Sequence, residues 1–211
     1  MAASILYLCK VIGKKNTTDL ILPKFLQLLK DDDEQVRLTI FKNVGLICDA
    51  LGVEALSQTT MPALNELATH TNWRIRAESV SLFFYFISRS PKELMDDKQI
   101  KLAIDYIRDR AFSVRKEGMK LLTNICKHFE SAWFEKAVMP KLLNIFKATS
   151  YLQRETILLT MEHLMPALSQ EYVFKYIYPS VKDLASDEVE NVRLSSITAL
   201  RELIDVLPKE K

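Results

Sequence analysis

The sequence has few of the residues that tight turns, metal sites and disulfide frameworks require. Only four of its 211 residues are glycine, too few for a fold rich in tight hairpins or for a phosphate-cradling loop. Its three cysteines are odd in number and lack metal-ligand spacing, so neither a metal site nor a disulfide framework is expected. No stretch approaches the roughly 18 uninterrupted apolar residues of a membrane span.

The charge balance is also close to neutral. Lys and Arg number 29 against 27 Asp and Glu, for a formal net charge of +2, which gives no general reason to expect nucleic acid or an anionic membrane as partner. The apolar stretch Ala2–Leu8 is followed, not preceded, by lysines and has no small-residue cleavage site, so a signal peptide is not expected. We expect a soluble protein in a reducing compartment, the cytoplasm alone or the cytoplasm and nucleus.

What the sequence does contain is an internal repeat. Arginine and proline each recur with a period of 39 residues, at Arg37, Arg76, Arg115, Arg154 and Arg193, and at Pro23, Pro62, Pro140 and Pro179. Such self-similarity is the signature of a stacked repeat architecture. We predict one domain over residues 1–211, with a half-repeat at 1–15 and repeats at about 19–56, 57–95, 96–131, 132–170 and 171–211.

Each repeat is predicted to be a pair of helices. The first begins near the proline, which suits an opening turn because its missing N–H needs no partner there. In repeat one we expect helices at about residues 22–29 and 35–51. Apolar residues of the second helix recur at steps of three and four and so share one face, with equivalent positions at Val44, Phe83, Leu122, Met161 and Leu200. One hairpin cannot bury that face alone, so the sequence predicts an all-α solenoid.

A hairpin of this length, with proline in its first helix and Asp-x5-Arg across its turn, resembles the HEAT repeat. His70 and Ala148 replace the acid in two of the five repeats. The whole chain resembles the C-terminal repeats of the scaffolding A subunits of type 2A serine/threonine phosphatases. The resemblance is carried by Leu22–Pro23, Val36–Leu38, Leu56–Gln58, Asn72–Arg76, Tyr151–Arg154 and Glu190–Arg193.

The resemblance implies a non-catalytic scaffold that holds the phosphatase catalytic subunit on the turns of its HEAT repeats. In that family the N-terminal repeats hold regulatory subunits, so this chain is expected to bind regulatory subunits only weakly. By the same resemblance, the residues that contact the catalytic subunit are Trp73, Arg74, Phe112, Tyr151, Leu152 and Val189.

Three of these residues also stand out by position. Trp73, Phe112 and Tyr151 each precede the periodic arginine by three residues, whereas the first and last repeats have Glu34 and Glu190 there. Turn tips stack along one edge of a solenoid, so we expect three exposed rings in a row that anchor a partner. The alternative is that each ring folds back over its own hairpin.

The periodic arginines are expected to be structural. Their spacing predicts a ladder of ion pairs and carbonyl hydrogen bonds between hairpins, formed by Asp31, Arg37, Arg76, Asp109, Arg115, Arg154, Asp187 and Arg193. Cys9, Cys48 and Cys126 share one register of the repeat and are expected to be small core residues.

Two other classes of function are alternatives to a phosphatase scaffold. An adaptor or transport-receptor fragment would hold another protein in its concave groove, against the second helices. A HEAT-like DNA glycosylase would need a basic groove with an acidic catalytic residue, and the near-neutral charge offers no such groove. We therefore predict no catalytic residue, cofactor or metal, and no nucleic-acid or membrane partner.

Overall fold

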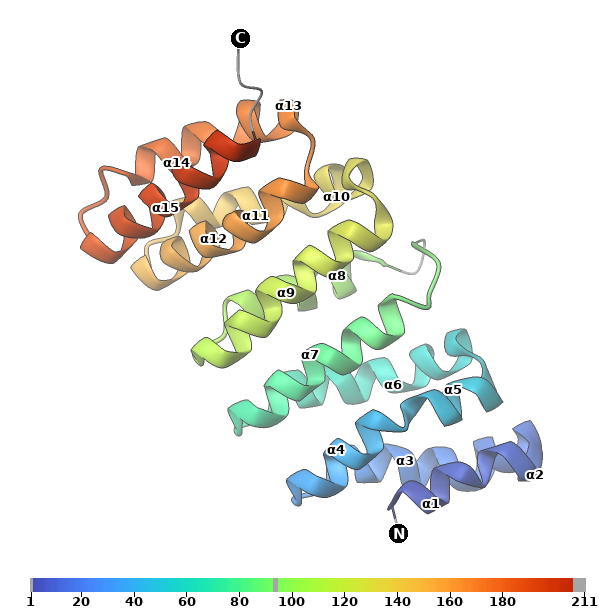
Figure 1. Ribbon diagram of the computed structural model, residues 1–211. Coiled ribbons are helices and arrows are strands. Elements are labelled where there is room, and N and C mark those ends of the chain that lie inside the picture. Colours follow the sequence, from blue (N-terminus) through green and yellow to red (C-terminus); the bar gives the residue numbers. More distant parts are fainter. Residues whose placement is uncertain (1, 93–94, 207–211) are drawn as a thin grey trace. The chain divides into compact units, whose positions relative to one another are not determined.

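The computed structural model describes residues 2–92 and 95–206, and its regular structure over these residues is helical, without strands (Figure 1). The prediction of an all-α fold made of helical hairpins is therefore confirmed for this part of the chain. The chain divides into two compact units between Pro91 and Lys92. That all repeats form one domain stays a prediction.

The first unit contains two complete hairpins and the helices that precede them. Its elements are α1 (Ala2–Tyr7), α2 (Cys9–Asn16), the π-helical turn η1 (Thr17–Ile21), α3 (Leu22–Leu28), α4 (Glu34–Lys42), α5 (Val44–Leu51), α6 (Val53–Ala68) and α7 (Trp73–Ile87). The predicted second helix of repeat one is thus present as α4 and α5, which are separated at Asn43.

The second unit contains three hairpins. Its elements are α8 (Asp97–Ile107), α9 (Phe112–Phe129), α10 (Ser131–Ala137), α11 (Met139–Leu143), the 3₁₀ turn η3 (Asn144–Lys147), α12 (Tyr151–Leu164), the 3₁₀ turn η4 (Met165–Ala167), α13 (Gln170–Tyr172), the π-helical turn η5 (Val173–Ile177), α14 (Tyr178–Leu184) and α15 (Glu190–Val206). Within this unit α9, α12 and α15 are the second helices of successive hairpins, and α12 packs against both of the others.

The core lies on the predicted faces of the second helices. Val44, Phe83, Leu122 and Met161 are buried, whereas Leu200 is half-buried. Taking such a side chain out of water stabilises the fold by about 1.5–3 kcal/mol. The three cysteines are also buried in this core, as predicted.

The prolines have a more varied place than predicted. α3, α11 and α14 do begin beside Pro23, Pro140 and Pro179. However, α3 and α14 continue directly from the helical turns η1 and η5, and only Val138 separates α11 from α10. Pro62 lies inside α6. Proline removes a hydrogen bond and its ring crowds the carbonyl four residues earlier, which accounts for the π-helical turns η1 and η5 just before two of these prolines.

Candidate partner-binding site on the turns

The three aromatic residues singled out in the sequence occupy one structural position. Trp73, Phe112 and Tyr151 are the first residues of α7, α9 and α12. Each follows an N-cap residue with extended backbone, so the chain turns immediately before the ring. Their exposed fractions are 38%, 56% and 48%. The prediction that the rings are exposed is confirmed, and they do not fold into the core.

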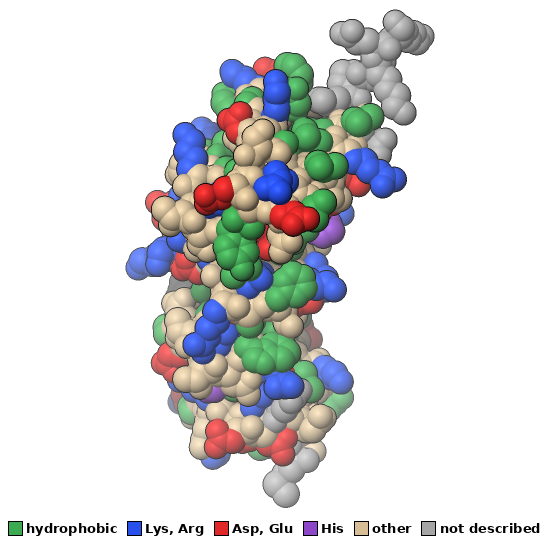
Figure 2. Space-filling model, turned by 90° about the vertical axis from the view of Figure 1, so that its left-hand side faces the viewer, with side chains coloured by type: hydrophobic (Ala, Val, Ile, Leu, Met, Phe, Trp, Pro, Cys, Tyr) green, Lys and Arg blue, Asp and Glu red, His purple; other side chains and the backbone are tan. Residues whose placement is uncertain are grey.

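Phe112 and Tyr151 belong to the second unit, where α9, α12 and α15 begin at the same end (Figure 1). Figure 2 faces the side on which these helices begin and shows hydrophobic side chains at the surface among basic and acidic ones. Leu152 and Val189, beside these helix starts, are half-buried. We call these four residues, Phe112, Tyr151, Leu152 and Val189, the tip surface of the second unit. Trp73 and the exposed Arg74 form the corresponding tip of the first unit.

A guanidinium group lies against two of the rings. Arg74 Cζ is 4.7 Å from the ring centroid of Trp73, and Arg115 Cζ is 5.5 Å from that of Phe112. The face of an aromatic ring attracts such a cation. Trp73 and Phe112 therefore each have a neighbour that limits the motion of the ring. This lowers the entropy that the ring loses when a partner binds.

The periodic arginines hold the turns beneath these rings. In all five, Nη1 donates to the two carbonyls five and six residues earlier, at 2.6–3.1 Å. These carbonyls belong to the arginine's own hairpin, so the predicted carbonyl hydrogen bonds between hairpins are instead bonds within one turn. The reason is that the end of each first helix presents carbonyls without helical partners.

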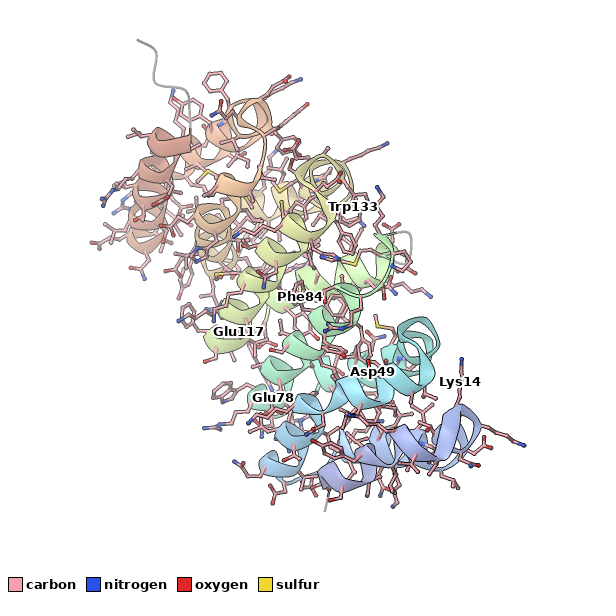
Figure 3. The ribbon with its side chains drawn as sticks, turned by 45° about the vertical axis from the view of Figure 1, so that its right-hand side comes forward. Lys14, Asp49, Glu78, Phe84, Glu117 and Trp133 are labelled. Carbon is pink, nitrogen blue, oxygen red and sulfur yellow. The ribbon has the colours of Figure 1, made fainter. Side chains whose placement is uncertain are left out.

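Two of the periodic arginines make ion pairs with the next hairpin: Arg154 with Asp187, both of the predicted ladder, and Arg37 with Glu78, which was not among the predicted residues. The rest of the ladder stays a prediction. Arg154 donates from Nε and Nη2 to Asp187 at 2.7 and 3.0 Å. Arg37 donates from Nε to Glu78 at 3.3 Å. Glu78 lies on α7, where Figure 3 labels it. The hydrogen bonds from Arg154 lower the pKa of Asp187, and the same bonds raise the pKa of Arg154.

The acid of the Asp-x5-Arg spacing has a second role within the turn. Asp31, Asp109 and Asp187 each accept the backbone N–H two residues further on, at 2.7–2.9 Å. His70 stands at the same place, and its Nδ1 accepts the N–H of Asn72 at 3.0 Å. Histidine therefore replaces aspartate as the acceptor in this turn. Ala148, at the remaining position, has no side-chain acceptor.

Sequence reasoning missed two hollows in the second unit, because neither has a sequence motif. One, of about 710 Å³, lies on the second helices and is lined by residues that include Cys126, Glu162 and Glu202. Burial, together with the charge of Glu202, raises the pKa of Glu162. The other, of about 670 Å³, lies on the first helices beside Ala148.

The described residues contain no group of three or more side chains placed to hold a metal ion. None of the helices described is long and apolar enough to cross a membrane. Burial raises the pKa of Cys48 and of Cys126 to about 11, which keeps both thiols protonated.

Comparison with known sequences finds similarity to HEAT repeats and to regulatory subunits of phosphatases. Residues 21–51 match the HEAT repeat family. Over 97% of its length the chain is 24% identical to Serine/threonine-protein phosphatase 4 regulatory subunit 1 of Homo sapiens, of which it spans 22%. It is 31% identical over 72 residues to the regulatory A-type subunit of protein phosphatase PP2A from Schizosaccharomyces pombe, a match that covers 34% of this chain and 12% of that protein.

Comparison with solved structures shows the fold. The chain is similar to Cex1p (TM-score 0.70, 14% identity, 98% of this chain and 39% of that one) and to importin beta (0.64, 13%, 98% and 29%). It is also similar to the MAST/Orbit N-terminal domain (0.58, 22%, 86% and 82%). The specific resemblance to the scaffolding subunits of type 2A phosphatases stays a prediction. The chain is an all-helical HEAT-repeat solenoid related to the regulatory subunits of serine/threonine phosphatases.

Proposed function

We propose that this chain is a non-catalytic scaffold that binds the catalytic subunit of a serine/threonine phosphatase through the turns of its hairpins. The observation that supports this most directly is the exposure of Phe112 and Tyr151 at the same position of successive hairpins. Aromatic side chains offer a large contact area with few rotatable bonds, and they are common energetic centres of interfaces.

The turns are built to present these anchors rigidly. Arg115 donates hydrogen bonds to the carbonyls of Asp109 and Arg110, just before Phe112. Arg154 does the same for the turn before Tyr151, through the carbonyls of Ala148 and Thr149. A loop that is ordered before binding loses less entropy in the complex. The tip surface is therefore suited to a partner that docks against a fixed shape.

Two phosphatase types are candidates for this partner. The type 2A catalytic subunit is the first, on the resemblance of the turn segments and the 31% identical stretch. The type 4 catalytic subunit is the second, because the relative named for that phosphatase matches 97% of the chain. Both candidates use the same proposed surface.

An adaptor that binds another protein against its second helices is the alternative function. The hollow on α9, α12 and α15 favours it, because the half-buried Glu162 lies there near Glu202. The two proposals differ in the residues that a partner would cover, so one binding assay separates them.

The assay measures binding of the purified chain to immobilised catalytic subunits of types 2A and 4. We expect saturable binding that the double variant Phe112→Ala/Tyr151→Ala abolishes and that Glu162→Gln leaves unchanged. Binding that survives the double variant but is lost with Glu162→Gln would replace the scaffold proposal with the adaptor. Absence of binding to either type of catalytic subunit would refute the phosphatase assignment.

A further inference from the structure

The hollow on the first helices of the second unit adjoins the tip surface. Its volume is about 670 Å³, and clefts that bind ligands typically have volumes of about 300–1,000 Å³. Thr149 and Gln153 line the hollow, and they flank Tyr151 at two residues on either side. A protein that covers the ring of Tyr151 can therefore also enter this hollow.

The charged residues that line the hollow leave one arginine over. Lys141 pairs with Asp97 at 2.6 Å, and Lys101 pairs with Asp105 at 3.5 Å. The remaining charged residue of the lining is Arg108, which is exposed just after the end of α8. In the part of the chain that the structure describes, no carboxylate lies within ion-pair distance of Arg108. The hollow therefore carries one uncompensated positive charge, which favours an anionic group.

Three polar side chains of the lining are available to a ligand as well. The amides of Asn144 and Gln153 and the hydroxyl of Thr149 make no hydrogen bond to another described residue. A side-chain amide has an NH₂ donor and a C=O acceptor, which match the C=O and the N–H of a peptide backbone. Ile104 and Ile145, each less than a tenth exposed, add an apolar part of the wall. The lining thus suits a peptide segment better than a small anion.

We propose that this hollow binds an extended, acidic segment of a protein partner. The backbone of the segment pairs with the amides of Asn144 and Gln153, and one of its carboxylates pairs with Arg108. A guanidinium group binds a carboxylate through strong, charge-assisted hydrogen bonds. Glutamate suits the hollow because its methylene groups can contact the apolar wall. The chemistry of the segment follows from the hollow itself, whereas the identity of the partner as a phosphatase subunit rests on the proposed function.

The test uses the side-chain NH₂ signals of Asn144 and Gln153 in NMR spectra of the free chain, assigned with Asn144→Ala and Gln153→Ala. N-acetyl-triglutamate amide is titrated at constant ionic strength and pH 7, and N-acetyl-triglutamine amide is the uncharged match. We expect saturable shifts of both signals with the triglutamate peptide, with a dissociation constant in the millimolar range. Arg108→Gln should weaken binding about tenfold.

Lys98→Gln is the matched control. Lys98 is an exposed residue of α8 that does not line the hollow, so its loss should change the dissociation constant less than about twofold. Equal weakening by Arg108→Gln and Lys98→Gln would overturn the proposal, because it would show only a general attraction between charges.

Three further results would overturn the proposal. These are no saturable shift with triglutamate, equal binding of triglutamine, and tighter binding of inorganic phosphate than of triglutamate at equal ionic strength. The last result would identify a site for a free anion in place of a peptide segment. Because no phosphatase is present in the titration, its outcome is independent of the proposed scaffold function.

Discussion

Arg154 and Asp187 form a two-pronged ion pair, with N–O distances of 2.7 and 3.0 Å. Their side chains are only 11% and 6% exposed. Asp187 also accepts the N–H of Val189 at 2.9 Å. The carboxylate of Asp187 therefore joins α12 to the turn before α15. These are the segments that carry Tyr151 and Val189 of the tip surface.

Removing this carboxylate should destabilise the fold. We expect Asp187→Ala to lower the free energy of unfolding by about 3 kcal/mol, because it removes the buried carboxylate that neutralises the guanidinium of Arg154. Glu188→Ala is the matched control: Glu188 lies 3.8 Å from the same arginine but is 86% exposed, and its loss should cost less than about 0.5 kcal/mol. Urea unfolding of both variants measures the two free energies. Equal losses of unfolding free energy in Asp187→Ala and Glu188→Ala would contradict the role of the buried pair.

The same pair should make stability depend on pH. The pKa of Asp187 is lowered in the folded chain by the hydrogen bonds from Arg154, so its contribution is present above the unfolded pKa of about 4. It is lost as the pH falls through the lower folded value. The stability difference between the native chain and Asp187→Ala should thus be constant from pH 7 to about 5 and shrink toward pH 3. A difference that does not change over this range would contradict the assignment.

Much of this architecture could be predicted from sequence, because the pattern that specifies it is periodic. The 39-residue period of Arg37 and its counterparts gave the hairpins, and the offset of three residues gave the exposed rings. The carbonyls to which each arginine Nη1 donates could not be predicted, since the choice depends on where the carbonyls of the turn lie. Nor could the role of His70, because the same acceptor position is filled by two different chemical groups.

The candidate site could also be predicted only where its residues follow the repeat. The sequence identified Phe112 and Tyr151 but not the contact of Arg115 with Phe112, since contacts between side chains have no period of their own. The replacement at Ala148 was visible in the sequence, whereas the unpaired Nε of Arg115 required the structure.

Gly118 should not tolerate a methyl group. A Cβ built there would lie 2.9 Å from Tyr106 Cβ and 3.0 Å from the backbone nitrogen of Ile107, so α8 and α9 would have to separate. Although alanine is the better helix former by about 1 kcal/mol, we expect Gly118→Ala to destabilise the fold by about 1–3 kcal/mol.

Gly45→Ala is the control for this prediction. It is also helical, but its Cβ would meet only the hydroxyl of Tyr85, at 3.2 Å, at the end of a side chain that can move. Thermal unfolding of both variants should show a loss for Gly118→Ala alone. A stabilised Gly118→Ala would contradict the close packing of these helices.

Filling the gap in the arginine ladder should stabilise the chain. We expect Ala148→Asp to raise the free energy of unfolding by about 1 kcal/mol, because its carboxylate can accept the free Nε–H of Arg115. Ala148→Ser, which adds a hydroxyl but no charge, should gain less. Chemical denaturation at pH 7 provides the comparison, and a destabilised Ala148→Asp would show that the space beside Arg115 is closed.

The thiols should be protected while the chain is folded. Cys48 and Cys126 are buried, and their pKa values of about 11 leave almost no thiolate at pH 8. Thiolate is the reactive form, so we expect slow labelling by Ellman's reagent that becomes fast in urea. Rapid labelling of either thiol in the native chain would contradict its place in the core.

The central claim is that exposed turn aromatics bind the phosphatase catalytic subunit, and the dissociation constant of that complex tests it most directly. We expect Trp73→Ala, Phe112→Ala and Tyr151→Ala each to weaken binding about thirtyfold, or about 2 kcal/mol, with nearly unchanged melting temperature. Phe174→Ala is the matched control, since Phe174 is 59% exposed but lies in η5, outside the turns. Native affinity in the turn variants, or a lowered melting temperature with native affinity in the folded remainder, would contradict the account.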